Sequence, residues 1–292
     1  MADVNLSPKP YVTVIIPVYN QWDKLWLCLQ ALEQQTYPQE QIKILVIDNN
    51  PTDVARTLPD SKLNITLLQQ PKPGSYAARN LGITNAQGDV LAFTDSDCIP
   101  HPNWILEGIT TMVNFQVPRV GGRVEVIFNS STPKIVELYD SLFSFPQEQL
   151  VSQGTAVTAN VFIKKHLFSQ VGLFDETLLS GGDSQWGRRA QNLGYPIVYA
   201  PEAMIQHPAR STLKELLIKT RRISAGVLWN PPSFWFLRGF HPPVDQILQI
   251  CEQQTFGVTE KLGLLVLAYL VKLTKTWHRT LLVLGVQKPR RA

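Results

Sequence analysis

The segment Val90-Leu91-Ala92-Phe93-Thr94-Asp95-Ser96-Asp97 decides how this sequence of 292 residues is interpreted. Its first five residues have the apolar and β-branched character of a buried strand, and two carboxylates follow where that strand would leave its sheet. In an open α/β sheet, ligands bind outside the carboxyl ends of the strands. Side chains two residues apart in an extended segment point the same way, so Asp95 and Asp97 are expected to reach one cation, or a cation and a sugar hydroxyl. Solvated aspartates at a loop entry are the alternative, since Asp and Ser are common turn residues.

Apolar strands alternate with helical patterns in the first hundred residues, which is typical of a mostly parallel sheet covered by helices. Strands are predicted at 12–18, 42–47, 65–68 and 90–94, and helices at 22–35 and 75–85. Polar loops follow at Tyr19-Asn20, at Asp48 to Asp53 and at Asp95 to Asp97. Because parallel strands end at one edge of a sheet, these loops are expected to build one site.

Composition excludes several classes of protein. With 44% hydrophobic and 17% charged residues, the chain is not disordered and is long enough for one large α/β domain with an appendage. The three cysteines form no C-x-x-C pair, which suggests neither a disulfide framework nor structural zinc and favours a reducing compartment. The polar stretch from Met1 to Pro10 lacks the apolar core of a secretory signal, so a cytoplasmic location is expected.

Charge is distributed unevenly along the sequence. Residues 1–200 carry 14 basic and 18 acidic side chains, whereas residues 201–292 carry 13 and 5. A basic C-terminal third could contact nucleic acid, a phosphate-bearing substrate or an anionic membrane face. No aromatic-interleaved basic repeat accompanies this charge, so nucleic acid is not expected as a partner.

Phosphate groups would have to be held without a glycine-rich loop. The sequence contains neither G-x-G-x-x-G after the first strand nor G-x-x-x-x-G-K-[ST]. Arg79 is the cation expected where phosphates and a divalent metal share a site, and a structural ion pair is its alternative. His207 is a candidate metal ligand or diphosphate contact, or a structural histidine.

Four segments, in this order and spacing, resemble the family 2 glycosyltransferases of the GT-A fold. They are Val14-Ile15-Ile16-Pro17-Val18-Tyr19-Asn20, Val46-Ile47-Asp48-Asn49-Asn50-Pro51-Thr52-Asp53, Ala78-Arg79-Asn80 and Thr94-Asp95-Ser96-Asp97. A fifth match, to the acceptor-side segment of the family, comprises Val171-Gly172-Leu173-Phe174-Asp175-Glu176, Gly181-Gly182-Asp183, Arg189 and Gly194-Tyr195. The resemblance covers residues 10–210.

The resemblance implies an α/β protein of the GT-A type, with a Rossmann-like, mixed but mostly parallel sheet flanked by helices. We expect a tail at 1–10, a glycosyltransferase domain at 11–210 and a basic helical extension at 211–292. Within the domain, residues 11–100 would form the nucleotide-sugar half and residues 101–210 the acceptor half.

The resemblance also implies a nucleotide-diphosphate sugar as donor and a divalent metal, Mn²⁺ or Mg²⁺. Asp95 and Asp97 match the D-x-D motif of the family, in which the first approaches the ribose and sugar and the second binds the metal. Asp48 would bond the base, and Asp95 and His207 are further candidate metal ligands. The expected donor-binding residues are Pro17, Tyr19, Asn20, Asp48, Arg79, Asp95 and Ser96.

On the acceptor side, Asp183 matches the second residue of the family's Glu-Asp pair, which is proposed there as the general base. This sequence departs from the family pattern, because Gly182 occupies the glutamate position. Gly182, Trp186 and Arg189 complete the expected acceptor side, with Trp186 either stacking on a sugar ring or packing in the core. Alternatively, Asp183 caps a helix at 184–192, which does not exclude catalysis.

The chemistry of sugar transfer requires the same groups. A divalent metal neutralises the charge that develops on the departing diphosphate, and a carboxylate removes the proton of the acceptor hydroxyl. We therefore expect an inverting glycosyltransferase that acts on a saccharide or lipid-linked acceptor in polysaccharide or glycolipid biosynthesis. The alternatives are a catalytically silent nucleotide-sugar-binding relative or partner subunit, and a nucleotidyltransferase on a similar sheet.

The C-terminal region has an apolar run, Leu262 to Val271, which cationic residues interrupt before Leu281 to Val286. A helix that crosses a bilayer needs about 20 apolar residues, so no span is expected. The region would either lie peripherally on the cytoplasmic face of a membrane or pack on the domain or another subunit. Pro231 to Pro243 is a candidate lip that faces lipid or acceptor.

Overall fold

The computed structural model describes residues 9–51, 57–58, 61–226 and 239–286. The last part of the loop predicted at Asp48 to Asp53 and most of the lip predicted at Pro231 to Pro243 lie outside these residues. Within the described part, the chain forms two compact units. The first unit runs to Glu125 and includes Pro146–Leu178 and Gly182–His207.

The second unit contains Val126–Phe145, Leu179–Gly181 and the chain from Pro208 onward. The sequence had suggested that all residues from 101 to 210 belong to the acceptor half of one domain. In the structure, the segment Val126–Phe145 groups instead with the C-terminal helices.

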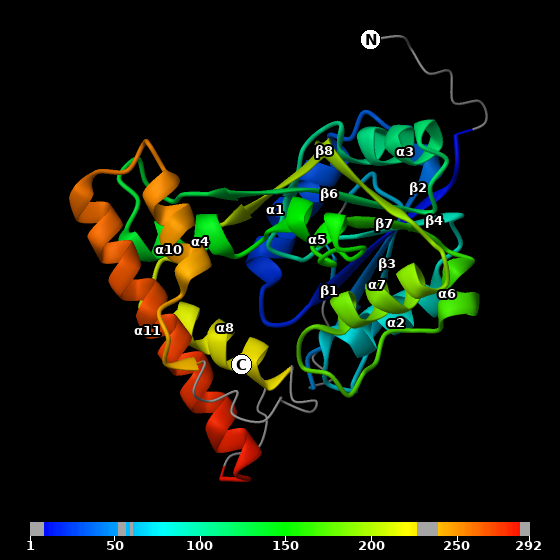
Figure 1. Cartoon of the computed structure of the whole chain (residues 1–292). Coiled ribbons are helices and arrows are strands. Elements are labelled where there is room, and N and C mark those ends of the chain that lie inside the picture. The colour runs from blue at the N-terminus through cyan, green and yellow to red at the C-terminus, as the bar shows by residue number, and fades with distance from the viewer. Residues whose placement is uncertain (1–8, 52–56, 59–60, 227–238, 287–292) are drawn as a thin grey trace. The chain divides into compact units, whose positions relative to one another are not determined.

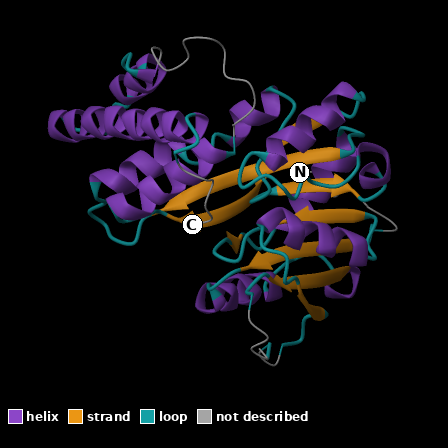
Figure 2. Ribbon diagram, turned by 90° about the horizontal axis from the view of Figure 1, so that it is seen from below, coloured by secondary structure: helices purple, strands orange, loops and turns teal. Residues whose placement is uncertain are grey.

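The strands of the described residues form an eight-stranded sheet in the order β3-β2-β1-β4-β7-β6-β8-β5. Strands β3, β2, β1 and β4 are parallel, β7 is antiparallel to β4 and β6, and β5 is antiparallel to β8. The mixed sheet flanked by helices is confirmed (Figure 2). It is parallel from β3 to β4, whereas the pairings of β7 and β5 are antiparallel, so the sheet as a whole is less parallel than expected. The strands are β1 Val12–Val18, β2 Ile42–Asp48, β3 Ile65–Gln69, β4 Val90–Phe93, β5 Ile99–Pro100, β6 Arg119–Ile127, β7 Val161–Lys164 and β8 Ile197–Pro208.

Helices cover both faces of the sheet in the first unit. In Figure 1, α3 lies above the sheet and α2 and α7 lie below it. The helices of this unit are α1 Trp22–Glu33, α2 Ser75–Asn85, α3 Trp104–Asn114, α5 Gln147–Ser152, α6 Leu167–Val171 and α7 Gly182–Asn192, with a short 3₁₀ turn, η1, at Gln39–Gln41.

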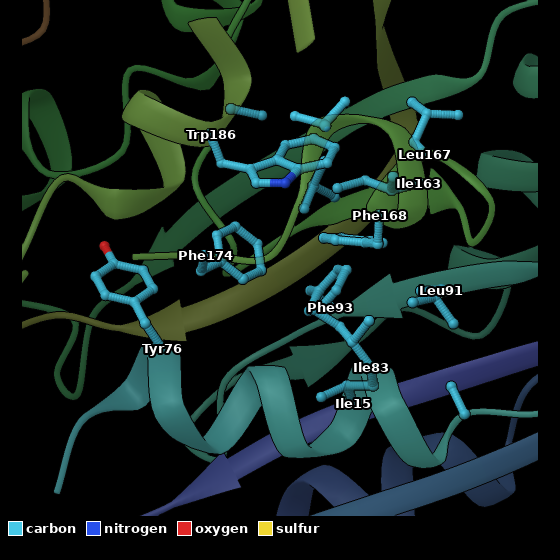
Figure 3. Close-up of a cluster of buried hydrophobic side chains, with 14 of the residues drawn as sticks. Ile15, Tyr76, Ile83, Leu91, Phe93, Ile163, Leu167, Phe168, Phe174 and Trp186 are labelled. Atoms are coloured by element: carbon cyan, nitrogen blue, oxygen red, sulfur yellow. The ribbon is translucent and has the colours of Figure 1, made fainter. Parts of the chain in front are cut away.

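The alternation of side chains along β7 shows how both faces are buried. Val161 and Ile163 join the aromatic core beneath the sheet, which α2, α6 and α7 close (Figure 3). Phe162, between them, points to the other face and packs on Trp104 of α3, with ring centroids 5.1 Å apart. Because both faces of the sheet are covered, the strand sequences are nearly continuous runs of apolar residues. Their polar ends are therefore held in fixed positions along the sheet edge.

The second unit is helical. It contains α4 Ile135–Phe143, α8 Leu213–Ala225, α10 Val244–Glu252 and α11 Val258–Val283. Its core is built by Leu138, Tyr139, Leu216, Ile250, Leu264, Leu267 and Ala268. Helix α11 runs against α4, α8 and α10 (Figure 1).

The first C-terminal apolar run and the start of the second, up to Val283, belong to one continuous helix, α11, of 26 residues. The lysines and the arginine that separate the runs are good helix formers, so they interrupt the apolar pattern without ending the helix. Among the described residues, no helix is both long enough and apolar enough to cross a membrane.

Candidate active site

The carboxyl ends of β1, β2 and β4 meet at one edge of the sheet. Val18 is the register partner of Asp48, and Ile15 is the partner of Phe93, so Asp95 emerges two residues beyond a strand that pairs with β1. Beside them at the end of β1, Tyr19 is 47% exposed and Asn20 adopts the left-handed region at φ 54°. Asn tolerates that conformation better than most residues, and the chain turns sharply there.

The end of β2 is fixed by its own side chains. Asp48 is 1% exposed, and its Oδ1 accepts hydrogen bonds from the main-chain N of Asn50 at 3.0 Å and from the Asn50 side chain at 2.5 Å. Asn49 donates to the Gln70 carbonyl at 2.8 Å and accepts from the Gly74 amide at 2.8 Å. These bonds tie the loop after β2 to the turn that starts α2. From the sequence, Asn49 was expected only to belong to a turn.

Arg79 on α2 and Asp95 form an ion pair. Nη2 of Arg79 lies 2.5 Å from Oδ1 of Asp95, and their side chains are 5% and 34% exposed. The structural ion pair weighed as an alternative for Arg79 is therefore present. It does not exclude a role in binding, because the Nε of Arg79 is buried without a hydrogen-bond partner among the described residues.

The aspartate segment is a turn, not an extended strand end. The main-chain N of Cys98 donates to the carbonyl of Asp95 at 3.1 Å, and residues 96 and 97 form the turn. The expectation that Asp95 and Asp97 point the same way as neighbours in an extended segment is therefore wrong. Ser96 is buried between them, and its hydroxyl donates to Oε1 of Gln21 at 3.3 Å.

Asp97 faces His207 of β8 instead. Its Oδ2 lies 3.5 Å from Nε2 of His207 and 3.9 Å from Nζ of Lys24. The candidate metal ligands are thus distributed over two neighbouring pairs, Asp95 with Arg79 and Asp97 with His207. Within the described ranges there is no group of three or more His, Cys, Asp or Glu side chains placed to hold a metal ion.

The donor set nevertheless fits a hard divalent cation. Mg²⁺ and similar ions at phosphate-transfer sites are held by one or two carboxylates and complete their coordination with water and substrate phosphates. Asp97 and Asp95 supply such carboxylates at the sheet edge, and His207 supplies an imidazole nitrogen.

Two buried thiols lie close to these aspartates. Burial and the negative charges of Asp95 and Asp97 raise the pKa of both Cys28 and Cys98. Both side chains are therefore protonated thiols, which are poor nucleophiles. They contribute packing beneath the site.

The candidate base, Asp183, lies in the first turn of α7, which begins at Gly182. A capping position before a helix at 184–192 is therefore not observed. Its Oδ1 accepts from the hydroxyl of Tyr76 at 3.3 Å and from the Ser184 amide at 2.9 Å, and its Oδ2 accepts from the Thr158 amide at 3.4 Å. Three donors from three segments thus orient the half-buried carboxylate.

Tyr76 explains why glycine stands at position 182. Its hydroxyl accepts a hydrogen bond of 2.8 Å from the Gly182 amide, and a Cβ at that position would lie only 2.7 Å from the tyrosine ring. The ring of Tyr76 thus occupies space that a glutamate side chain would need. Burial, together with the charge of Asp183, raises the pKa of Tyr76, so the phenol remains a neutral donor to Asp183.

Helix α2 joins the two halves of the site. Tyr76 contacts Asp183, and its ring centroid lies 5.8 Å from the guanidinium carbon of Arg79, one turn further along the helix. The side-chain amide of Asn80 donates a hydrogen bond to the Phe174 carbonyl at 2.9 Å and accepts one from the Phe174 main-chain N at 3.0 Å. One helix therefore positions the Asp95 pair, Asp183 and the segment around Phe174. Tyr76 was not among the residues predicted from the sequence, although the unusual Gly182 was a signal of a bulky neighbour.

Two residues expected on the acceptor side make structural contacts, Trp186 in the core and Arg189 to a loop. Trp186 is 2% exposed, stacks on Phe168 with centroids 4.7 Å apart, and donates its indole N–H to the Gly172 carbonyl at 2.7 Å (Figure 3). The hypothesis that it stacks on a sugar is therefore wrong. Arg189 donates to the carbonyls of Val171 at 2.7 Å and Leu173 at 2.6 Å, and so holds the loop that follows α6.

Known proteins resemble this chain in sequence over the segments that form the site. The family model described as Glycosyl transferase family 2 matches residues 13–161, which include the β1, β2 and β4 ends and Arg79. The glycosyltransferase AglE of Haloferax volcanii is 37% identical over 255 residues, which cover 81% of this chain and 83% of that relative. The chain belongs to glycosyl transferase family 2. It is accordingly a transferase enzyme of glycan biosynthesis.

A further relative and two solved structures extend the comparison. The relative, from Methanococcus voltae, is a dolichyl N-acetyl-alpha-D-glucosaminyl phosphate 3-beta-D-2,3-diacetamido-2,3-dideoxy-beta-D-glucuronosyltransferase and is 24% identical over 230 residues, 72% of this chain and 70% of the relative. The mannosyltransferase PcManGT from Pyrobaculum calidifontis, solved with GDP-Man and Mn²⁺, aligns with a TM-score of 0.56 at 16% identity over 96% of this chain and 76% of its own. Staphylococcus aureus TarS in complex with UDP-GlcNAc aligns with a TM-score of 0.52 at 14% identity over 96% and 93%. The predicted GT-A fold is confirmed.

Proposed function

We propose that this family 2 glycosyltransferase moves a sugar from a nucleotide-diphosphate sugar to a hydroxyl acceptor, with inversion at the anomeric carbon and with a divalent metal. The observation that carries the proposal is the convergence of Asp48, the Arg79–Asp95 pair and the Asp97–His207 pair on strands whose ends meet at one sheet edge. This is where open α/β sheets bind ligands.

The donor would lie across the ends of β1 and β2. Asp48 would bond the base, while Pro17, Tyr19 and Asn20 at the end of β1 would form the wall beside it. Arg79 would contact the phosphates, and the Asp95-Ser96 main chain would approach the ribose and sugar. Structural neighbours of this chain were solved with GDP-Man and with UDP-GlcNAc, which supports a nucleotide-sugar donor.

Asp97, with Asp95 and His207, would hold Mn²⁺ or Mg²⁺. When bound, such an ion supplies positive charge that stabilises the departing diphosphate. The protein's own cations contribute to the same task, because Arg79 is already oriented by Asp95, and Lys24 lies 3.9 Å from Asp97. A structural neighbour contains Mn²⁺, which supports the choice of ion.

Asp183 would remove the proton of the acceptor hydroxyl. Tyr76 and the Thr158 amide hold the carboxylate in one orientation, which a general base requires for attack along a defined line. A single base on the face of the sugar opposite the diphosphate gives inversion. Gly182 leaves room for the ring of Tyr76, whose hydroxyl donates to Asp183.

The acceptor would be a saccharide or a lipid-linked sugar, in polysaccharide or glycolipid biosynthesis. The name of the Methanococcus voltae relative includes a dolichyl phosphate sugar, which supports a lipid-linked acceptor. We also propose peripheral contact with the cytoplasmic face of a membrane, because one face of α11 exposes large apolar side chains at helical spacing. They are Val258, Leu262, Val266, Tyr269, Leu270 and Trp277.

The test is a transfer assay with a panel of nucleotide sugars and lipid-linked acceptors, with and without Mn²⁺. Asp97→Asn should abolish metal-dependent transfer, and Asp183→Asn should abolish transfer while donor binding persists. Asp23→Asn, an exposed carboxylate on α1, is the matched control and should retain activity. No metal-dependent turnover with any donor would favour a silent relative, and full activity of Asp183→Asn would favour a nucleotidyltransferase.

A further inference from the structure

The second unit contains a cavity of about 670 Å³, enclosed by α4, α8, α11 and the segment 239–246. All of its described lining residues belong to this unit. The cavity is within the range of volumes that hold a small molecule, which is about 300–1,000 Å³. Its lining combines apolar walls with an unusual number of cations.

Lys219 of α8 is the most deeply placed cation. Its Nζ is shielded from solvent and has no hydrogen-bond partner among the described residues, although Oδ1 of Asp140 lies 3.6 Å away. Asp140 is already engaged by Arg210, which lies 3.1 Å from both carboxylate oxygens and also donates its main-chain amide. The Asp140 carboxylate therefore compensates Lys219 only in part.

Lys275 and Arg279 lie one turn apart on α11. Both lie on the same face of α11 as the buried Leu264 and Ala268. This face is therefore apolar in the N-terminal half of the helix and cationic in its C-terminal half. Burial lowers the pKa of both, and Nε of Arg279 is buried without a hydrogen-bond partner in the described structure. Neither side chain forms an ion pair with a carboxylate of the described residues.

The charges around the cavity do not balance. Four basic side chains line it, Lys219, Lys272, Lys275 and Arg279, against the single lining carboxylate of Asp245, with Asp140 behind Lys219 as a shared partner. Shielded charges without partners are costly, and a bound anion would remove much of that cost. Phosphate oxygens are suitable partners, because charge-assisted hydrogen bonds from Lys and Arg are the stronger kind.

The remaining walls are apolar. Tyr139 and Phe143 come from α4, Leu216 and Ile223 from α8, and Val271 from α11. An inorganic anion would pair with the cations, but water would remain in contact with these apolar side chains. A ligand with an anionic head and a hydrocarbon part would satisfy both.

We propose that the second unit binds a phosphate ester that carries an apolar chain, with the phosphate between Lys219, Lys275 and Arg279. The inference depends only on contacts within the second unit, and it stands whether or not the proposed transfer reaction is correct. A lipid phosphate and a free phosphate share the head-group chemistry, and the two are separated by their apolar part.

Isothermal titration of the full chain, in phosphate-free buffer, tests this proposal with three probes: octyl phosphate, inorganic phosphate and octanol. Octyl phosphate should bind about tenfold more tightly than inorganic phosphate or better, because burial of its hydrocarbon chain adds affinity that inorganic phosphate lacks. Octanol should not bind measurably. Equal affinity for octyl phosphate and inorganic phosphate, or binding of octanol alone, would overturn the amphiphilic assignment.

Lys275→Met locates the site. It removes one charge while keeping a flexible side chain, and it should weaken octyl phosphate binding by at least about tenfold, the loss of one charge-assisted hydrogen bond. Lys214→Gln removes an exposed charge of α8 outside the cavity and should bind as the parent does. Unchanged affinity in Lys275→Met, or an equal loss in Lys214→Gln, would place the anion elsewhere. Because Lys275→Met removes a shielded charge, we expect it to fold, and a thermal melt checks this.

Discussion

The hydroxyl of Tyr76 donates a hydrogen bond to Oδ1 of Asp183 at 3.3 Å while it accepts one from the Gly182 amide at 2.8 Å. A neutral phenol thus connects the candidate base to the start of its own helix. The same ring lies beside Arg79, so the acceptor and donor halves are in contact through one side chain.

Tyr76→Phe should lower kcat by about tenfold or more with little change in the KM of the donor, because a hydrogen bond to a charged group contributes about 1.5–3 kcal/mol. Steady-state kinetics with separate variation of donor and acceptor measures this. Tyr195→Phe is the matched control, since it also loses a side-chain hydrogen bond, to Gln170, away from Asp183. Equal losses in both variants would assign Tyr76 a structural role only.

Gly182→Glu, which restores the residue typical of the family, should destabilise this chain by about 1–3 kcal/mol, the usual cost of overpacking. The cause is the tyrosine ring 2.7 Å from the new Cβ. In a Tyr76→Ala background the same substitution should reduce the free energy of unfolding much less. Denaturant melts of the two single variants and the double variant give the interaction energy between positions 76 and 182. Additive effects would contradict the steric explanation.

Trp186→Phe separates packing from sugar binding. Since the indole is buried on Phe168 and bonds the Gly172 carbonyl, the variant should lose roughly 1–3 kcal/mol of stability, less than the roughly 3–5 kcal/mol typical of truncation to alanine. The KM of the acceptor should not change. A raised acceptor KM with unaltered stability would restore the sugar-stacking hypothesis.

Stability should rise with pH between about 7 and 9.5 through Lys219. Burial and the nearby Arg210 lower its pKa from 10.5 to about 7, so in this window the unfolded chain binds more protons than the folded one, and raising the pH favours folding. Lys219→Met should flatten the rise, while Lys214→Gln should not. Urea melts across this range in phosphate-free buffer measure it, and a falling stability would contradict the lowered pKa.

Much of the first unit could be predicted from sequence, because its strands are buried on both faces. Strand β1 was predicted with its observed bounds, and β2, β3 and β4 each to within one residue. The same apolar continuity placed Asp48 and Asp95 correctly at the strand ends. The turn from Asp95 to Cys98 could not be predicted from the alternation of side chains between the two faces of a strand, since side chains alternate only while the backbone is extended.

Other features depend on contacts between distant segments, which a single sequence does not reveal. Tyr76 and Asp183 are 107 positions apart, and no local pattern links them. Trp186 was ambiguous because an aromatic residue in a helix suits both a core and a sugar platform. The grouping of Val126–Phe145 with α11 likewise depends on long-range packing, here by Leu138 and Tyr139.

The side chain of Asn49 has a consequence beyond the loop that it closes. Its amide joins the main chain at Gln70 and Gly74, and its own main-chain N bonds the Val18 carbonyl at 2.9 Å. The end of β1, the end of β2 and the first turn of α2 are therefore connected through one residue. If a nucleotide base binds at the loop after β2, as proposed above, a displacement of that loop would reach the helix that carries Tyr76 and Arg79.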